Sequence, residues 1–174
     1  MRDLFKPLNR LRTEMADFST YDRSGLRFHY PSNWMLEESG IDGSAGSIHG
    51  SIQLSSPTGA FWILNIHPFG TNPGTIAEEV LDALRDEYPD LEYEPIERTL
   101  GGRTLSGYEM HFFFLDLTNT ASILCFADET STYGVFWQCG DQLVLSGRAE
   151  EVPTEHVFEA ITQTLLDRLG TSKV

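Results

Sequence analysis

Long apolar runs, cysteines and basic side chains are all scarce in this chain of 174 residues. No uninterrupted apolar segment approaches the ~20 residues that a helix needs to cross a bilayer. The opening stretch, MRDLFKPLNRLRTEM, carries positive charge but has no apolar core and no small-residue cleavage site, so it does not have the pattern of a secretory signal. We therefore expect a cytoplasmic protein.

The chain has only two cysteines, Cys125 and Cys139, both in strand-like surroundings. If the hairpin between them is centred near Thr132, they lie opposite each other, and a cross-strand disulfide is then conceivable. A cytosolic setting favours two buried thiols instead.

Basic side chains are outnumbered, with 12 Lys and Arg against 26 Asp and Glu and a formal net charge of −14. Residues 1–12 hold four of the basic side chains and only one acid, so the rest of the chain is strongly acidic. Such a body repels phosphate backbones and anionic lipid, which makes nucleic acid and membranes poor partners. A protein with a basic surface remains a suitable partner, although acidic charge also serves solubility alone.

Apolar surface, in contrast, is plentiful, because 40% of the residues are hydrophobic and 11 Phe, 6 Tyr and 3 Trp are among the chain's side chains. A chain of this length suits a single domain with a sizeable core. We assign residues 1–25 to an N-terminal segment, a short helix packing on the domain, and residues 26–174 to the domain itself.

Alternating apolar residues predict strands. The first, LRFHYP at residues 26–31, stops at Pro31, which has no amide hydrogen to donate, and Ser32 and Asn33 suit a turn before Trp34 restarts the pattern. We interpret this break as a structural corner. Further strands are predicted at 51–56, 61–69, 91–100, 103–117, 121–127 and 133–139.

Two segments follow the helical period instead. Residues 75–78, TIAE, fit a capping box, and an apolar stripe follows them until Pro89. Pro153 opens a second amphipathic helix. The strands from residue 103 onward are apolar on both faces, and such a sheet needs cover on both sides. The predicted fold is α+β: a twisted, mostly antiparallel sheet flanked by helices on both faces, as an α/β/α sandwich.

Three stretches in this order resemble the PsbP-like fold family: LRFHYPSNW at 26–34, LGGRTLSGYEMHF at 100–112 and VFEAITQTLL at 157–166. The first is similar to the family's strand and Pro–x–x–Trp corner, the second to its glycine turn before a long central strand, and the third to its closing helix. The family includes an oxygen-evolving subunit of photosystem II, an import factor that binds the GTPase Ran, and small bacterial proteins. The resemblance covers residues 26–169 and implies a protein that acts by binding other proteins.

Five histidines are present, but none has the spacing of a zinc pair, so no metal site is predicted. Asn65, His67 and His111 interrupt otherwise apolar strands. They define an alternative hypothesis, in which they line a cleft of a small-ligand-binding protein or enzyme. Half-exposed strand histidines are the more ordinary explanation.

No catalytic constellation is apparent, and no cofactor is predicted. Ser106 lies in TLSGY, which lacks the nucleophile elbow. Cys125 stands between Leu124 and Phe126, and burial among apolar side chains makes a thiol inert. We therefore expect a protein that is not an enzyme.

The strongest local field is acidic, with nine acids between residues 78 and 97 against one Arg85. Most of those on the helix fall on its outer face, where they can simply be solvated or can steer a basic partner. The primary hypothesis is a protein-binding adaptor or chaperone-like module that uses this face. The residues expected to bind the partner are Glu78, Glu79, Asp82, Asp86 and Asp90.

Overall fold

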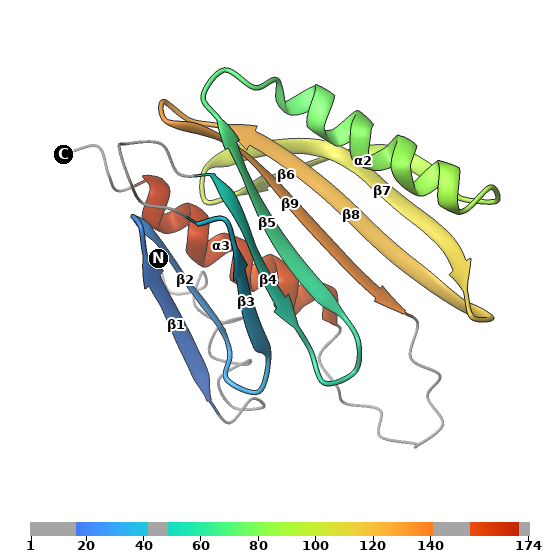
Figure 1. Cartoon of the computed structure of the whole chain (residues 1–174), viewed down its shortest axis with the longest axis horizontal. Coiled ribbons are helices and arrows are strands. Elements are labelled where there is room, and N and C mark those ends of the chain that lie inside the picture. The colour runs from blue at the N-terminus through green and yellow to red at the C-terminus, as the bar shows by residue number, and fades with distance from the viewer. Residues whose placement is uncertain (1–16, 42–48, 141–153, 171–174) are drawn as a thin grey trace.

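The computed structural model describes residues 17–41, 49–140 and 154–170 (Figure 1). The strands are β1 (Phe18–Arg23), β2 (Leu26–Pro31), β3 (Met35–Ser39), β4 (Gly50–Ser55), β5 (Phe61–Pro68), β6 (Glu92–Leu100), β7 (Arg103–Phe114), β8 (Leu117–Ala127) and β9 (Ser131–Gly140). The helices are α2 (Pro73–Glu87) and α3 (Thr154–Gly170).

Seven strands form one sheet in the order β3-β4-β5-β9-β8-β7-β6, and every neighbouring pair is antiparallel. The last strand in the chain, β9, lies inside the sheet, between β5 and β8. β1 and β2 form a separate antiparallel hairpin. The predicted α+β class and the antiparallel sheet are confirmed.

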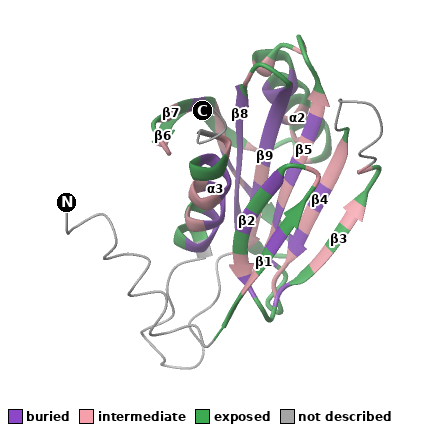
Figure 2. Ribbon diagram, turned by 90° about the vertical axis from the view of Figure 1, so that its left-hand side faces the viewer, coloured by how far each residue is buried: buried purple, intermediate pink, exposed green. Residues whose placement is uncertain are grey.

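The two helices serve two different hydrophobic cores, because neighbouring residues of β8 point to opposite faces. Ile123 and Cys125 pack with Leu81 and the rest of the inner stripe of α2. Leu124, between them, packs with α3 and the β1–β2 hairpin, as does Phe158. As a result β8 is mostly buried and β9 is buried or half-buried, while β3 and β6 at the edges are largely exposed (Figure 2).

Cover by the helices is only partial. α2 packs on β7, β8 and β9, whereas α3 packs on β2, β9 and β6. A helix is about 10 Å wide and neighbouring strands are about 4.8 Å apart, so one helix covers roughly two strands. Two helices therefore leave much of both faces of a seven-stranded sheet without helical cover. The structure therefore shows a large sheet with two helices, a coarser arrangement than the full sandwich expected from the sequence.

The break in the first predicted strand is a corner between β2 and β3. The Trp34 amide donates to the Pro31 carbonyl over 3.0 Å, which closes a tight turn. Trp34 is buried and meets Phe158 of α3 edge-on, with ring centroids 5.7 Å apart. The corner thus fixes the sheet against the helix.

Three details differ from the sequence-based expectation. Part of the predicted N-terminal segment, residues 18–23, is strand β1, paired with β2; residues 1–16 lie outside the described part. Helix α2 begins before the predicted capping box, because Asn72 already accepts from the Gly74 amide over 2.8 Å and Pro73 suits the first helical turn. The predicted strand 103–117 is cut by a turn at Leu115 and Asp116.

Candidate protein-binding surface

The five acids predicted to bind a partner all lie on the outer side of α2 or just beyond its end. Each of them is exposed: Glu78, Glu79, Asp82, Asp86 and Asp90. Glu87 and three acids of β6 are exposed beside them, and these nine residues define what we call the acidic surface: Glu78, Glu79, Asp82, Asp86, Glu87, Asp90, Glu92, Glu94 and Glu97. They lie close together along the chain because β6 follows α2, but Glu92 and Glu94 point to the face of the sheet opposite α2, since Tyr93 between them lies under Arg85.

Arg85 is the single basic side chain within this surface. It approaches Asp82 at 3.6 Å and lies over the Tyr93 ring, 5.3 Å from its centroid. Both charged groups are more than half exposed, so this pair is weak. A shallow cleft of about 470 Å³ runs here between the end of α2 and β6 and is lined by Asp82, Arg85, Asp86, Pro89, Leu91 and Tyr93. The surface therefore keeps a large excess of negative charge.

A second feature was not predicted from the sequence. Eight large apolar side chains are exposed among the described residues, and four of them lie within residues 113–117, which we call the β7–β8 tip. Phe113 is 69% exposed, Phe114 46%, Leu115 78% and Leu117 39%. The tip protrudes from the lower right end of the sheet in Figure 1.

The tip adjoins the acidic surface through Tyr88, the residue that caps the C-terminus of α2. Tyr88 stacks on Phe112 with centroids 4.3 Å apart and meets Phe114 edge-on at 6.3 Å. Glu87 and Asp90 flank Tyr88 in the sequence and are exposed. The exposed apolar residues of the tip thus have acids on their α2 side.

The tip could have been found from its composition. Residues 112–117 read FFFLDL, a run too apolar for a half-buried strand, with one acid that interrupts it. The turn itself was missed because Leu115 and Asp116 are not residues that usually make a two-residue hairpin turn.

The structure does not bring Asn65, His67 and His111 together. Asn65 and His67 lie on β5, where Asn65 is opposite Gly134 of β9. A Cβ added to Gly134 would lie 3.3 Å from the side chain of Ile76 on α2. Their face of the sheet is therefore the α2 face.

His111 is on the opposite face, because its neighbours Met110 and Phe112 are the residues of β7 that pack in the α2 core. It is also three strands away from β5, about 14 Å across the sheet. His111 instead contacts Thr120 at 3.2 Å and Glu109 at 3.3 Å. The predicted cleft is not formed by these residues, and no group of three or more potential metal ligands occurs in the described ranges.

The two cysteines are not joined in a disulfide and are not opposite each other. Cys125 pairs with Gly134 and Cys139 with Thr120, because the β8–β9 hairpin is centred between Glu129 and Thr130 and not at Thr132. Burial raises the pKa of Cys125 to about 12, which leaves it protonated and unreactive at neutral pH. It lies in the α2 core and His111 on the other face, so the two do not form a nucleophile–base pair.

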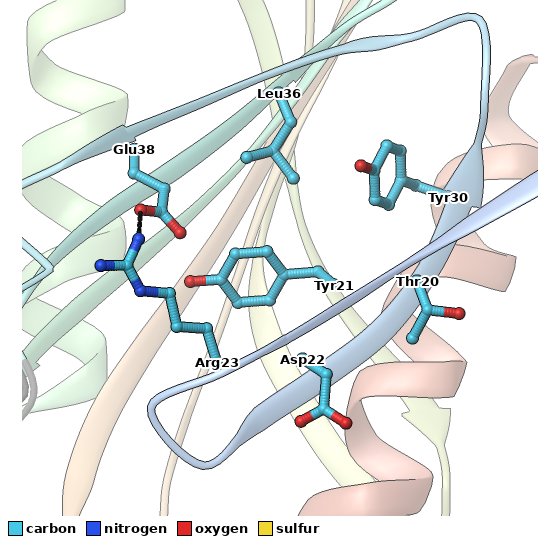
Figure 3. Close-up of a pocket in the computed structure, with 7 residues that line it drawn as sticks. All are labelled: Thr20, Tyr21, Asp22, Arg23, Tyr30, Leu36 and Glu38. Carbon is cyan, nitrogen blue, oxygen red and sulfur yellow. Dashed lines mark hydrogen bonds and ion pairs between the residues drawn. The ribbon is translucent and has the colours of Figure 1, made fainter.

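A further cleft, of about 460 Å³, lies between the β1–β2 hairpin and β3 (Figure 3). The Tyr21 ring stacks on Phe28, and its hydroxyl points toward Arg23 and Glu38, which form a 2.7 Å ion pair. That hydroxyl is buried without a hydrogen-bond partner, and burial, with Glu38 nearby, raises its pKa far above the usual value. Because residues 1–25 were assigned to a terminal segment, sequence reasoning missed this site.

Chemically, this cleft offers little. Arg23 already neutralises Glu38, and a phenol whose pKa is raised does not act as a base near neutral pH. Its opening is wide, and Tyr30 and Leu36 supply only a modest apolar wall. The β7–β8 tip with the acidic surface is therefore the stronger candidate.

None of the helices in the described ranges is both long and apolar enough to cross a membrane. No protein-family model matches the sequence, and no curated protein matches it. Among solved structures the chain is similar to the solution structure of cyanobacterial PsbP (CyanoP) from Synechocystis sp. PCC 6803. That match has 12% sequence identity and a TM-score of 0.52, and covers 86% of this chain and 91% of the other. The chain has a PsbP-like fold, as the sequence resemblance implied.

Proposed function

We propose that this protein is a non-enzymatic cytoplasmic module that binds another protein, as an adaptor or chaperone-like factor, through its acidic surface. One observation carries the proposal: an exposed apolar tip lies beside the C-terminal end of α2, and this helix and the strand that follows it carry nine exposed acids. Interfaces combine an apolar anchor with a polar rim in this way. Charge on the rim speeds the encounter with a partner of opposite sign.

The test compares affinity capture from the native lysate by three versions of the immobilised protein, at low and at high salt. One version is the wild type. The acidic variant carries Glu79→Gln, Asp82→Asn and Asp86→Asn, which share one stripe of α2 at helical spacing. All three changes remove charge from exposed positions without removing bulk.

The matched control neutralises three exposed acids far from this surface, with Glu37→Gln on β3 and Glu155→Gln and Glu159→Gln on α3. Both variants lose three negative charges, so a general effect of net charge cannot separate them. We expect a protein that the wild type and the control retain at low salt and that the acidic variant loses. Equal retention by both variants, or no salt-sensitive partner, would count against the proposal.

Binding of a small ligand is a second candidate, favoured by the unpartnered Tyr21 hydroxyl in the cleft between β1 and β3. A ligand that accepts a hydrogen bond from this hydroxyl would give it a partner. Thermal stabilisation of the wild type by a compound library, absent in Tyr21→Phe, would favour this candidate. Equal responses of the two proteins would argue against it.

A further inference from the structure

The apex of the β7–β8 tip holds two consecutive residues in a left-handed backbone conformation, Leu115 at φ 50° and Asp116 at φ 61°. They form the two-residue turn of the hairpin, since Phe114 pairs with Leu117 on either side. A turn with both φ values positive is the type that Asn-Gly satisfies at little cost. Leucine is a poor choice there, because its Cβ crowds the backbone when φ is positive.

Neither folding nor solubility accounts for this choice. Leu115 is 78% exposed, so its side chain contributes little to either hydrophobic core. A polar turn residue would relieve the backbone and remove an exposed apolar group from water. Residues held in unfavourable conformations gather at functional sites, and the observed φ values are such a case.

We propose that the β7–β8 tip is the anchor of the protein-binding surface, with Leu115 inserting into an apolar pocket on a partner protein whose rim is basic. This inference rests on the function proposed above and names the partner's chemistry. Leu115 and Phe113 are the most exposed apolar side chains of the tip. Their protrusion fits a concave pocket, while the acids beside Tyr88 meet the basic rim.

The negative charge around the tip favours a partner protein with a basic rim over a membrane or a second copy of this chain. Asp116 stands at the apex itself, Glu87 and Asp90 flank the Tyr88 that contacts Phe114, and the whole chain carries a net charge of −14. An anionic lipid surface would repel this end of the molecule. Two tips meeting around a two-fold axis would bring the same acids together. A basic rim is the arrangement that these charges favour.

The first experiment uses two phenylalanines as a matched pair. Phe113 and Phe69 are each 69% exposed, but Phe69 follows β5 at the opposite end of the sheet. Each is replaced in turn by the photo-crosslinking residue p-benzoylphenylalanine in the full-length protein, and the native lysate is irradiated. We expect a protein adduct from position 113 and none of the same protein from position 69, with the crosslinked peptide of the partner lying in an apolar pocket bordered by Lys or Arg.

The second experiment measures retention of that crosslinked protein by Phe113→Ser, Phe69→Ser and the double variant Leu115→Asn/Asp116→Gly. Loss of an anchoring side chain typically weakens binding by about 10-fold or more. We expect this loss for Phe113→Ser and for the double variant, whose turn is a favourable Asn-Gly, and wild-type retention for Phe69→Ser. We expect the double variant to keep its hairpin, and an unchanged urea midpoint or a higher one would show that its loss of binding is not due to unfolding.

The remaining outcomes overturn the inference in recognisable ways. Sedimentation of the protein with vesicles of phosphatidylcholine and phosphatidylglycerol, lost in the double variant, would make the occupant a membrane. A dimer in light scattering that the double variant abolishes would make it a second copy. If the acidic variant loses a partner that both tip variants retain, the proposed function stands and this inference fails. If no version retains a partner, both fail.

Discussion

Replacing the apex of the β7–β8 turn by Asn-Gly should stabilise the protein. In the wild type, Leu115 and Asp116 both have positive φ, and a left-handed conformation costs a side-chain-bearing residue about 1–2 kcal/mol, less for Asp and Asn. Leu115→Asn therefore recovers about 1 kcal/mol. Asp116→Gly relieves the second position, but glycine also gains about 0.5–1 kcal/mol of conformational freedom in the unfolded chain, so this change is close to neutral.

The opposing contribution is the burial lost with Leu115. Its side chain is 78% exposed, so only the small remainder contacts the protein. Part of this contact is with sequence neighbours, which also cover Leu115 in the unfolded chain. At about 25 cal/mol per Å² of apolar area buried on folding, the contact therefore stabilises the protein by well under 1 kcal/mol. The net expectation for Leu115→Asn/Asp116→Gly is a gain of about 0.5–1 kcal/mol in the free energy of unfolding, or about 1–4 °C in Tm.

The assay is urea unfolding followed by far-ultraviolet circular dichroism, with Leu115→Ala as the control. Alanine removes the side-chain contact but keeps a Cβ at positive φ, so it should lower the stability slightly or leave it unchanged. If the double variant instead unfolds at a lower urea concentration than the wild type, with the same slope, the wild-type turn is not strained at Leu115. The reason given for leucine at this position would then be wrong.

Three further outcomes follow from two buried groups and the half-buried Asp128. Thr162→Val should lower the free energy of unfolding by about 1–3 kcal/mol, because the buried Trp62 indole then loses the hydroxyl to which it donates over 3.1 Å. Thr162→Ser keeps a hydroxyl and should lower it less. Urea unfolding of both variants measures the difference. Cys125, whose pKa is raised to about 12 by burial, should resist iodoacetamide at pH 8 in the folded protein and react in urea, as read by mass spectrometry. Burial alone would raise the pKa of Asp128, but hydrogen bonds from Thr130 and Ser131 outweigh it and lower the pKa. The ionised Asp128 therefore stabilises the fold above its unfolded pKa of about 3.9, and the deficit of Asp128→Asn in urea should be present at neutral pH and shrink as the pH falls below that value.

Much of the fold follows from local signals in the sequence. Pro31 ends β2 because it lacks an amide hydrogen, and Trp34 is buried at the corner that follows. Tyr88 and Pro89 end α2 where the helical stripe stops. Alternate residues of β8 enter different cores, as two apolar faces require. In each case the signal itself is local, although the packing that buries Trp34 and the two faces of β8 comes from distant helices.

The position of the predicted site residues depends on strand order and register, which a single sequence does not reveal. His67 and His111 share an apolar strand pattern, but their faces are set by strand order and register, and the order places β9 beside β5 across a long separation in the chain. The tip escaped prediction for the opposite reason. Turn prediction relies on residues such as Asn and Gly, which adopt a positive φ at little cost in free energy. Leu115 adopts a positive φ at a higher cost, which the rest of the hairpin offsets.

The edges of the sheet support the tip, rather than strand addition, as the means of contact. β6 is an exposed edge strand, but it carries Pro95, which cannot donate to a further strand, and three acids that repel an approaching acidic copy. β3, at the other edge, has only five residues and contains Glu37 and Glu38, the second of which is held by Arg23. Both edges are thus poor templates for strand pairing. The β7–β8 tip lacks such protection, since its apolar side chains are solvent-exposed on a turn that a polar pair would form more easily. The tip is therefore the part of the described sheet that best fits an interaction site.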